Sequence, residues 1–312
     1  MGNEKRLLQQ AGRFALVDGI PFTLPVNSEK TPALMAAFSI DADKAKALLP
    51  GNEVHPFRLW NRGLLVITVV NYKVTDIGKY IEYSIAIACT HGSNPAPRLI
   101  PGLFTGYFGT GQYVYDLPVS SEVSVKGGKG IWGMPKHKAS LDFIEGPDWI
   151  SSKYDLDGEF MMKIEVKRPS SIWLPVKMGA ANYCAFRGML MKSYIYFQGK
   201  AGFRFFQKDS ARLQLGNHPR MQALKALDID PKPIFAGYFP ETKGMLDDYF
   251  ESWFLSYPEA PKVQPQGLES VFNLGRSEDW LPPPTAPIPN QNSSVGIATP
   301  ERKPMTSTST SI

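Results

Sequence analysis

Residues 80–90 alternate between two kinds of side chain, and this alternation predicts a β-strand with two unlike faces. One face is small or polar and carries a single carboxylate, whereas the other is apolar. The first face comprises Tyr80, Glu82, Ser84, Ala86 and Ala88, and the second comprises Ile81, Tyr83, Ile85, Ile87 and Cys89. We expect the apolar face to pack outward or against a second layer, and the polar face to line a cavity.

Other strand-like segments recur along the chain. Residues 64–74 consist mainly of Val, Ile, Leu, Thr and Tyr, which is typical of a buried strand. Further strands are expected at 138–144, 160–167, 192–198 and 202–207, with a turn at 198–202 between the last two. Helices are expected at 41–49, with Asp41 as the N-terminal cap, at about 217–227, at about 244–255 and within the first 20 residues. Many strands and few helices favour a mainly β (α+β) fold whose sheet closes around a pocket.

The composition changes after Tyr257, because ten of the 27 prolines lie in the last 55 residues. Such a segment buries little apolar surface. We therefore expect one domain over residues 1–257 and a Pro/Ser/Thr-rich, partly disordered extension over residues 258–312. Within the extension, Phe272, Leu274 and Trp280 are the residues expected to dock on the domain.

Charge and composition argue against several classes of protein. The net charge of +5 is scattered, with no basic helix, so no nucleic-acid partner is expected. No run of 18 apolar residues and no signal-peptide core occur, which predicts a cytoplasmic protein without a membrane span. Cys89 and Cys184 lie on apolar stretches and are expected to be buried thiols. Neither metal-ligand spacing nor a dinucleotide fingerprint is present, so no cofactor is expected.

Residues 127–138, Gly-Gly-Lys-Gly-Ile-Trp-Gly-Met-Pro-Lys-His-Lys, contain the candidate nucleophile, Lys136. The glycines predict tight turns. Trp132 and Met134 supply apolar cover, and Pro135 restricts the backbone just before the lysine. Desolvation favours a neutral amine, which attacks ketones and aldehydes to form a Schiff base. The alternative is a solvated surface lysine after an ordinary turn.

The segment Gly128–Lys136 resembles the one that holds the Schiff-base lysine in the acetoacetate decarboxylase family. Residues 80–83, Tyr-Ile-Glu-Tyr, resemble that family's strand with a catalytic glutamate, and residues 211–215 and 233–236 resemble its C-terminal part. The resemblance runs from about residue 20 to about 255. It implies a cone-like, mostly antiparallel β-barrel with flanking helices, a divergent lyase with Lys136 and Glu82 as catalytic residues, and a homo-oligomer.

The sequence also departs from the family pattern. His137 stands where the family commonly has a second lysine, and Lys138 shares a strand face with Lys136 if the strand is regular, so both are supporting candidates. The family's substrate-binding arginine falls at about Thr31, and its second glutamate falls at about Ile67. These replacements predict a larger and more apolar pocket, with Tyr80, Trp132 and Met134 near the lysine.

The expected activity is decarboxylation, through a Lys136 Schiff base, of a β-keto acid that is larger and more apolar than acetoacetate, in secondary metabolism. One alternative keeps the imine but performs aldol or dehydration chemistry. Another is a barrel that binds an apolar carbonyl compound without catalysis. Release of carbon dioxide separates the first from the second, and trapping of an imine separates both from the third.

Overall fold

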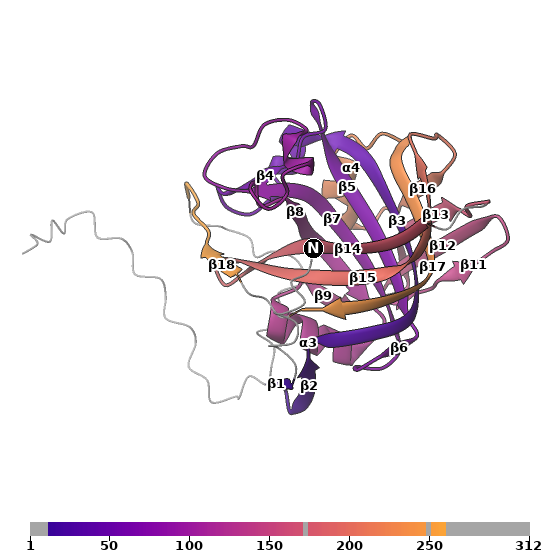
Figure 1. Ribbon diagram of the computed structural model, residues 1–312. Helices are drawn as coiled ribbons and strands as arrows, with labels where there is room; N and C mark the ends of the chain where they lie inside the picture. The colour runs from indigo at the N-terminus through magenta and orange to yellow at the C-terminus, as the bar shows by residue number, and fades with distance from the viewer. Residues whose placement is uncertain (1–11, 171–173, 248–250, 260–312) are drawn as a thin grey trace, which may run out of the picture. The chain divides into compact units, whose positions relative to one another are not determined.

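The computed structural model describes residues 12–170, 174–247 and 251–259 (Figure 1). Their dominant feature is one large sheet that closes on itself, as predicted. Neighbouring strands of the ring pair in the order β7, β5, β3, β17, β15, β14 and β8, and β8 pairs back with β7. The pairs are antiparallel, except that β14 and β8 meet in parallel over two residues. The bounds are β3 Val26–Asp41, β5 Arg62–Tyr72, β7 Tyr80–His91, β8 Gly111–Val119, β14 Leu174–Phe186, β15 Met189–Phe205 and β17 Pro233–Leu246.

Shorter elements extend the barrel at its margins. Strand β9 (Lys136–Lys138) runs parallel to β8, β4 (Val54–Pro56) pairs with β7, β6 (Val74–Thr75) pairs with β3, and β18 (Glu251–Phe254) pairs with β15. A hairpin of β1 (Arg13–Val17) and β2 (Ile20–Leu24) precedes the barrel. The helical elements are α2 (Ala42–Lys46), η1 (Ile100–Gly102), α3 (Glu122–Trp132), η2 (Pro219–Met221) and α4 (Gln222–Lys225).

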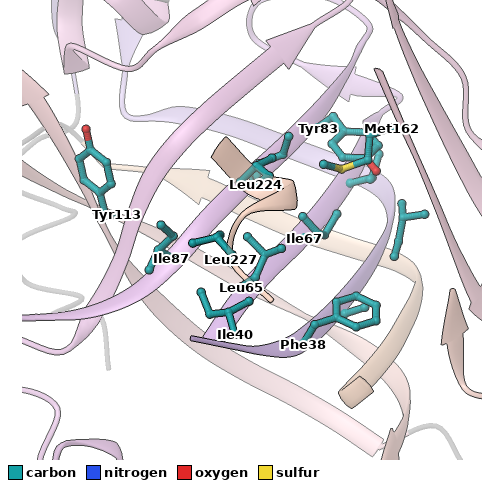
Figure 2. Packing of buried hydrophobic residues seen from close by; sticks show 14 of the residues in the cluster. Phe38, Ile40, Leu65, Ile67, Tyr83, Ile87, Tyr113, Met162, Leu224 and Leu227 are labelled. Carbon is teal, nitrogen blue, oxygen red and sulfur yellow. The ribbon is translucent and has the colours of Figure 1, made fainter. Parts of the chain in front are cut away.

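A second sheet packs on the outer face of the barrel. It consists of β10 (Ser140–Leu141), β11 (Ile144–Glu145), β12 (Trp149–Leu156), β13 (Glu159–Lys167) and β16 (Ala211–Leu215). The main core forms where the two layers meet, and Figure 2 shows Ile67, Tyr83 and Ile87 of the barrel together with Met162 and Leu224. The apolar face of β7 therefore packs against a second layer, as the alternation of residues 80–90 predicted. This packing turns Glu82 and Ser84 toward the inside of the barrel.

Several local expectations prove wrong. The glycine-rich segment before Lys136 forms α3 instead of turns, because Ser121 caps its first turn and the glycines allow close packing. Residues 198–202 lie inside the long strand β15, where Gly199 lets the backbone of Glu241 approach. Residues 244–246 and 251–254 are strands because pairing with β3 and β15 overrides their helical pattern.

Other expectations concern the ends of the chain. The short helix expected in the first 20 residues was centred on Leu7, Leu8 and Ala11, which lie outside the described part, and the following residues Arg13–Val17 form strand β1. Apart from residues 258–259, the expected extension also lies outside it, including Phe272, Leu274 and Trp280. Cys89 and Cys184 are free and buried. No helix in the described ranges has the length and apolarity needed to cross a bilayer.

Candidate active site

The turn after α3 carries Lys136 back along that helix. Gly133 ends the helix in a left-handed conformation (φ 63°), and its N–H bonds to the carbonyls of the last helical turn. The chain then reverses, and β9 places the Lys136 side chain against Gly128. A Cβ atom at Gly128 would lie 2.3 Å from Lys136 Cδ, so the helix needs glycine at this position.

Lys136 is 2% exposed, and its amine contacts polar groups from two other elements. Its Nζ lies 2.7 Å from Glu82 Oε2 on β7, and it donates a hydrogen bond of 2.9 Å to Ser124 Oγ on α3. The ring of Tyr80 also lies close, with its centroid 5.5 Å from Nζ. The structure thus brings Lys136 and Glu82 together as a mostly buried ion pair, the arrangement that lets a proton pass directly between amine and carboxylate.

Two stacked tyrosines extend this group of polar contacts. The side chains of Ser124 and Tyr72 interact with Tyr80, and the two tyrosine rings stack with centroids 4.5 Å apart. Burial, and next the negative charge of Glu82, raise the pKa of both phenols well above the ordinary value of 10.0. Both therefore stay protonated at neutral pH and keep a hydroxyl for hydrogen bonding.

The ion pair lies between two cavities, which we call the large chamber and the small chamber. The large chamber has a volume of about 100 Å³ and contains Glu82 in its wall. The small chamber has a volume of about 20 Å³ and contains Lys136 and Ser124 in its wall. Four residues border both chambers, namely Ser28, Tyr72, Ile195 and Leu246.

The wall of the large chamber is mainly apolar. Among the described residues that line it, Glu82 is the only charged one. Its apolar lining includes Met35, Val70, Met134, Phe197 and Phe239, and its neutral polar lining includes Thr31, Thr68, Ser84, Gln112 and Asn182. Gln112 donates a hydrogen bond of 2.7 Å to Asn182, so part of this polar surface is already paired.

The two positions where family charges were expected to be missing lie on different sides of the barrel wall. Thr31 lines the large chamber, and its hydroxyl donates to the carbonyl of Glu29. Ile67 is instead fully buried in the outer core, and its neighbour Thr68 faces the chamber. Ile67 therefore does not line the chamber as expected, because alternation along β5 turns its neighbour Thr68 inward instead.

The two supporting candidates do not accompany the amine of Lys136. His137 points to the other side of β9, where its Nδ1 lies 3.3 Å from Asp116 Oδ1 and its Nε2 lies 3.0 Å from the Tyr154 hydroxyl. Burial lowers the pKa of His137 below 6.5, although Asp116 opposes this shift. The Lys138 side chain is 64% exposed, and its amine lies 3.9 Å from Glu122.

The pocket candidates all border a chamber. Tyr80 and Trp132 line the small chamber, and Met134 lines the large one. Trp132 also donates a hydrogen bond of 2.8 Å to the carbonyl of Asp247, which fixes its ring.

Sequence reasoning missed Ser124 and Tyr72. The signal for Ser124 was its place one helical turn before Gly128, which becomes visible only once residues 122–132 are seen as a helix. The signal for Tyr72 was its position directly opposite Tyr80 in the pairing of β5 and β7. No group of three or more His, Cys, Asp or Glu residues in the described ranges is placed to hold a metal ion, and the absence of a cofactor stays a prediction.

Comparison with known proteins completes this description. The family model for acetoacetate decarboxylase (ADC) matches residues 15–175, which is just over half of the chain. The chain belongs to the acetoacetate decarboxylase family. It is an acetoacetate-decarboxylase-like enzyme, and the matched range includes both Lys136 and Glu82. No curated protein matches the sequence significantly.

Solved structures share the acetoacetate decarboxylase fold with this chain at low sequence identity. An acetoacetate decarboxylase from Legionella pneumophila has a TM-score of 0.52 at 12% identity, over 73% of this chain and 88% of the other. A second acetoacetate decarboxylase has a TM-score of 0.52 at 13% identity, over 75% and 91% of the two chains. The enduracididine biosynthesis enzyme MppR, with HEPES bound, has a TM-score of 0.50 at 13% identity, over 74% and 88%.

Proposed function

We propose that this enzyme is a Schiff-base lyase in which Lys136 attacks the ketone of an apolar β-keto acid and carbon dioxide is released. The observation that carries the proposal is the 2.7 Å contact between Lys136 Nζ and Glu82 Oε2, buried between two chambers inside a barrel of this family. An amine and a carboxylate at this distance supply the nucleophile and the proton carrier that imine chemistry requires.

The first stage is formation of the imine. A proton moves from the Lys136 ammonium to Glu82, which leaves a neutral amine and a carboxylic acid. The amine attacks the substrate carbonyl, and Glu82 returns the first proton to the carbonyl oxygen. Glu82 then carries a second proton from the nitrogen to this hydroxyl, which leaves as water and gives the iminium. Ser124, which accepts a hydrogen bond from the same nitrogen, holds the amine in place beside Glu82.

The second stage is loss of carbon dioxide. The electron pair of the bond to the carboxylate carbon moves into the iminium, and the nitrogen becomes neutral as an enamine. An apolar chamber favours this step, because two opposite charges disappear where water stabilises them poorly. Decarboxylation of a carboxylate consumes one proton, so Glu82 takes up a proton from solvent and delivers it to the enamine carbon. Water then hydrolyses the imine to release the product.

The lining of the large chamber supports an apolar substrate. Acetoacetate has a small methyl group and a carboxylate, and no cation lines the described part of this chamber to form a charge-assisted hydrogen bond. The chamber of about 100 Å³ is smaller than a cavity of about 150 Å³ that binds benzene. This volume excludes a bulky substrate, so we infer a β-keto acid that extends beyond acetoacetate by only a few carbons.

Aldol or dehydration chemistry is the second candidate. It is favoured by the position of Glu82, a base beside the amine, and by the missing cation for a substrate carboxylate. In a retro-aldol reaction, the base removes the proton of a β-hydroxyl group while the iminium accepts the electrons. This reaction breaks a carbon–carbon bond without release of carbon dioxide.

The test is reductive trapping together with measurement of carbon dioxide. The protein is incubated with 3-oxohexanoate or acetoacetate, and borohydride is added. We expect a secondary amine on Lys136, found by peptide mass mapping, and a kcat/KM about tenfold higher for 3-oxohexanoate, since each buried methylene contributes ~0.8 kcal/mol. Lys136→Met should abolish both trapping and turnover, whereas Lys138→Arg, in the same stretch of chain, should retain both.

The outcomes separate the candidates. Trapping with carbon dioxide release supports the decarboxylase. Trapping without it, combined with cleavage of a β-hydroxy ketone such as diacetone alcohol, supports the aldol alternative. Turnover that leaves Lys136 unmodified contradicts both, and a barrel that binds 2-hexanone without either trapping or turnover is a binding protein.

A further inference from the structure

The small chamber differs from the large one in size, and it contains the nucleophile Lys136 in its wall. Hydroxyl groups belong to five of the residues around it, namely Ser28, Tyr72, Thr75, Tyr80 and Ser124, and Lys136 completes this polar side. Its volume of about 20 Å³ exceeds the roughly 10–15 Å³ that a single water molecule needs. A buried water also needs two to four polar partners, and this wall offers them.

Short contacts connect the chamber wall to the reacting nitrogen. Lys136 Nζ donates to Ser124 Oγ at 2.9 Å, the Tyr80 ring centroid lies 5.5 Å from the same nitrogen, and Tyr80 stacks on Tyr72 with ring centroids 4.5 Å apart. Ser124 is 1% exposed, and the two tyrosines are 7–8% exposed, so bulk water has little access to this group. The three hydroxyl-bearing residues line the same chamber as the lysine, so a water molecule in that chamber can link them for proton transfer.

We propose that the small chamber binds the one water molecule that the Schiff-base reaction releases and later consumes, and that Ser124 and Tyr80 carry its protons. The inference rests on the proposed Lys136 imine. It assigns a water site, and a relay role for Tyr80, to the side of the amine that faces away from the large chamber.

The hydrolytic step balances with this assignment. The iminium and one water give the ketone and the Lys136 ammonium. The water oxygen forms its bond to the imine carbon, the carbon–nitrogen bond breaks toward nitrogen, and both water protons finish on nitrogen. Ser124 contacts that nitrogen, and Tyr80 contacts Ser124, so the hydroxyls can accept and return each proton in turn.

Two separate chambers also meet the opposite requirements for water of the two reaction steps. The apolar wall of the large chamber favours loss of carbon dioxide in the absence of water, whereas imine hydrolysis needs water beside the same nitrogen. A separate, smaller chamber with hydroxyl groups in its wall supplies that water without filling the substrate site. Since Tyr72 and Ser28 border both chambers, the water stays within reach of the reacting carbon.

Oxygen exchange into a ketone that cannot decarboxylate tests the proposal. 2-Butanone is incubated with the enzyme in ¹⁸O-water, and the ¹⁸O content of the ketone is followed by mass spectrometry. Wild type should exchange oxygen far faster than Lys136→Met. Tyr80→Phe should lower the Lys136-dependent exchange rate at least tenfold, and Tyr72→Phe should lower it by a smaller factor.

A matched control and an equilibrium measurement exclude a merely structural effect. Tyr113→Phe removes a hydroxyl from a buried tyrosine that lines neither chamber, and its exchange rate should equal that of wild type. Imine trapped with borohydride after equilibration should stay within twofold in Tyr80→Phe, because the water path changes the rate of interconversion and leaves the end states similar.

Each other result counts against the proposal. Exchange in Tyr80→Phe at the wild-type rate, with exchange still dependent on Lys136, overturns the water site and leaves the Schiff base standing. Loss of trapped imine in Tyr80→Phe also overturns it, because the tyrosine would then hold the lysine itself. Wild-type protein without Lys136-dependent exchange overturns the Schiff base and the water site together.

Discussion

Lys136 and His137 are neighbours on β9, yet they face opposite sides of the barrel wall. Lys136 turns inward to Glu82, and His137 turns outward to Asp116. Each is a mostly buried basic side chain within reach of a carboxylate. On the outer side Tyr154, from the second sheet, and Arg220 complete the cluster. On the inner side the pair borders two chambers.

The difference is the space beside each pair. Neither chamber is lined by His137 or Asp116, and the side chains of the second layer fill the region around them. A buried ion pair enclosed by packing stabilises or orients a structure, whereas one beside a cavity can meet a substrate. Burial and pairing alone therefore do not identify a catalytic group, and adjacency to a chamber of suitable lining does.

The sharpest test compares one carboxylate from each side of the wall. Glu82→Gln should lower turnover by about 10²–10⁴-fold and keep the fold, since it removes proton exchange while preserving shape. Asp116→Asn should lower the free energy of unfolding by about 1–3 kcal/mol, because hydrogen bonds to a buried carboxylate weaken, and leave turnover within a few-fold. Steady-state kinetics and thermal melting measure both. Equal loss of turnover in the two variants would show that the inner and outer carboxylates do not differ in their role.

A second prediction concerns the position of the inner amine. Gly128→Ala adds a methyl group 2.3 Å from Lys136 Cδ and 2.8 Å from Cε, so the lysine must move. Turnover should fall by about 10²-fold, as expected for a displacement near 1 Å. Stability should fall little, since alanine favours a helix over glycine by about 1 kcal/mol and offsets part of the strain.

The matched control is Gly106→Ala, where an added Cβ meets no atom within 4 Å and activity should be unchanged. If Gly128→Ala turns over substrate at the wild-type rate, the close approach of α3 does not set the position of the amine.

The fold and the inner pair were largely predictable because they depend on short-range patterns. Alternation over residues 80–90 assigned Glu82 to the polar face of a strand, and its apolar partner face, with Tyr83 and Ile85, lies in the outer core. The motif before Lys136 indicated a sheltered lysine. It did not reveal α3, because glycines inside a helix look like turns until their packing against Phe22, Val17 and Lys136 is known.

The surroundings of the pair were not predictable, because they depend on register between distant segments. Tyr72 reaches Tyr80 through the pairing of β5 with β7, and Ser124 reaches Lys136 across a helix and a reversal of the chain. The same limit applies to Ile67. Side chains alternate between the two faces of a strand, so an uncertainty of one residue in the expected position decides whether a side chain faces the chamber or the outer core. The contacts of His137 with the outer cluster were not predictable for the same reason, because Asp116, Tyr154 and Arg220 lie on three separate elements or loops.

We expect the smallest effect on turnover for His137→Gln, on the outer side of the barrel wall. Its main effect should be a change in how the stability of the fold depends on pH. Burial holds the pKa of His137 below 6.5 in the folded protein, with Asp116 opposing the shift, and Arg220 and Lys129 reinforcing it. Between that lowered pKa and 6.5, the unfolded chain binds more protons than the folded one. Acid therefore destabilises the fold, and stability returns as the pH rises through this window.

Removal of His137 should flatten this slope by up to about 1.4 kcal/mol per pH unit in denaturant unfolding, with turnover within threefold of wild type. His55→Gln offers a parallel, because burial also lowers the pKa of His55, which lies on β4, away from both chambers. Both variants should flatten the slope alike. A large loss of turnover in His137→Gln alone would show that the outer cluster acts on Lys136 through β9, so that the two sides of the wall work as one site.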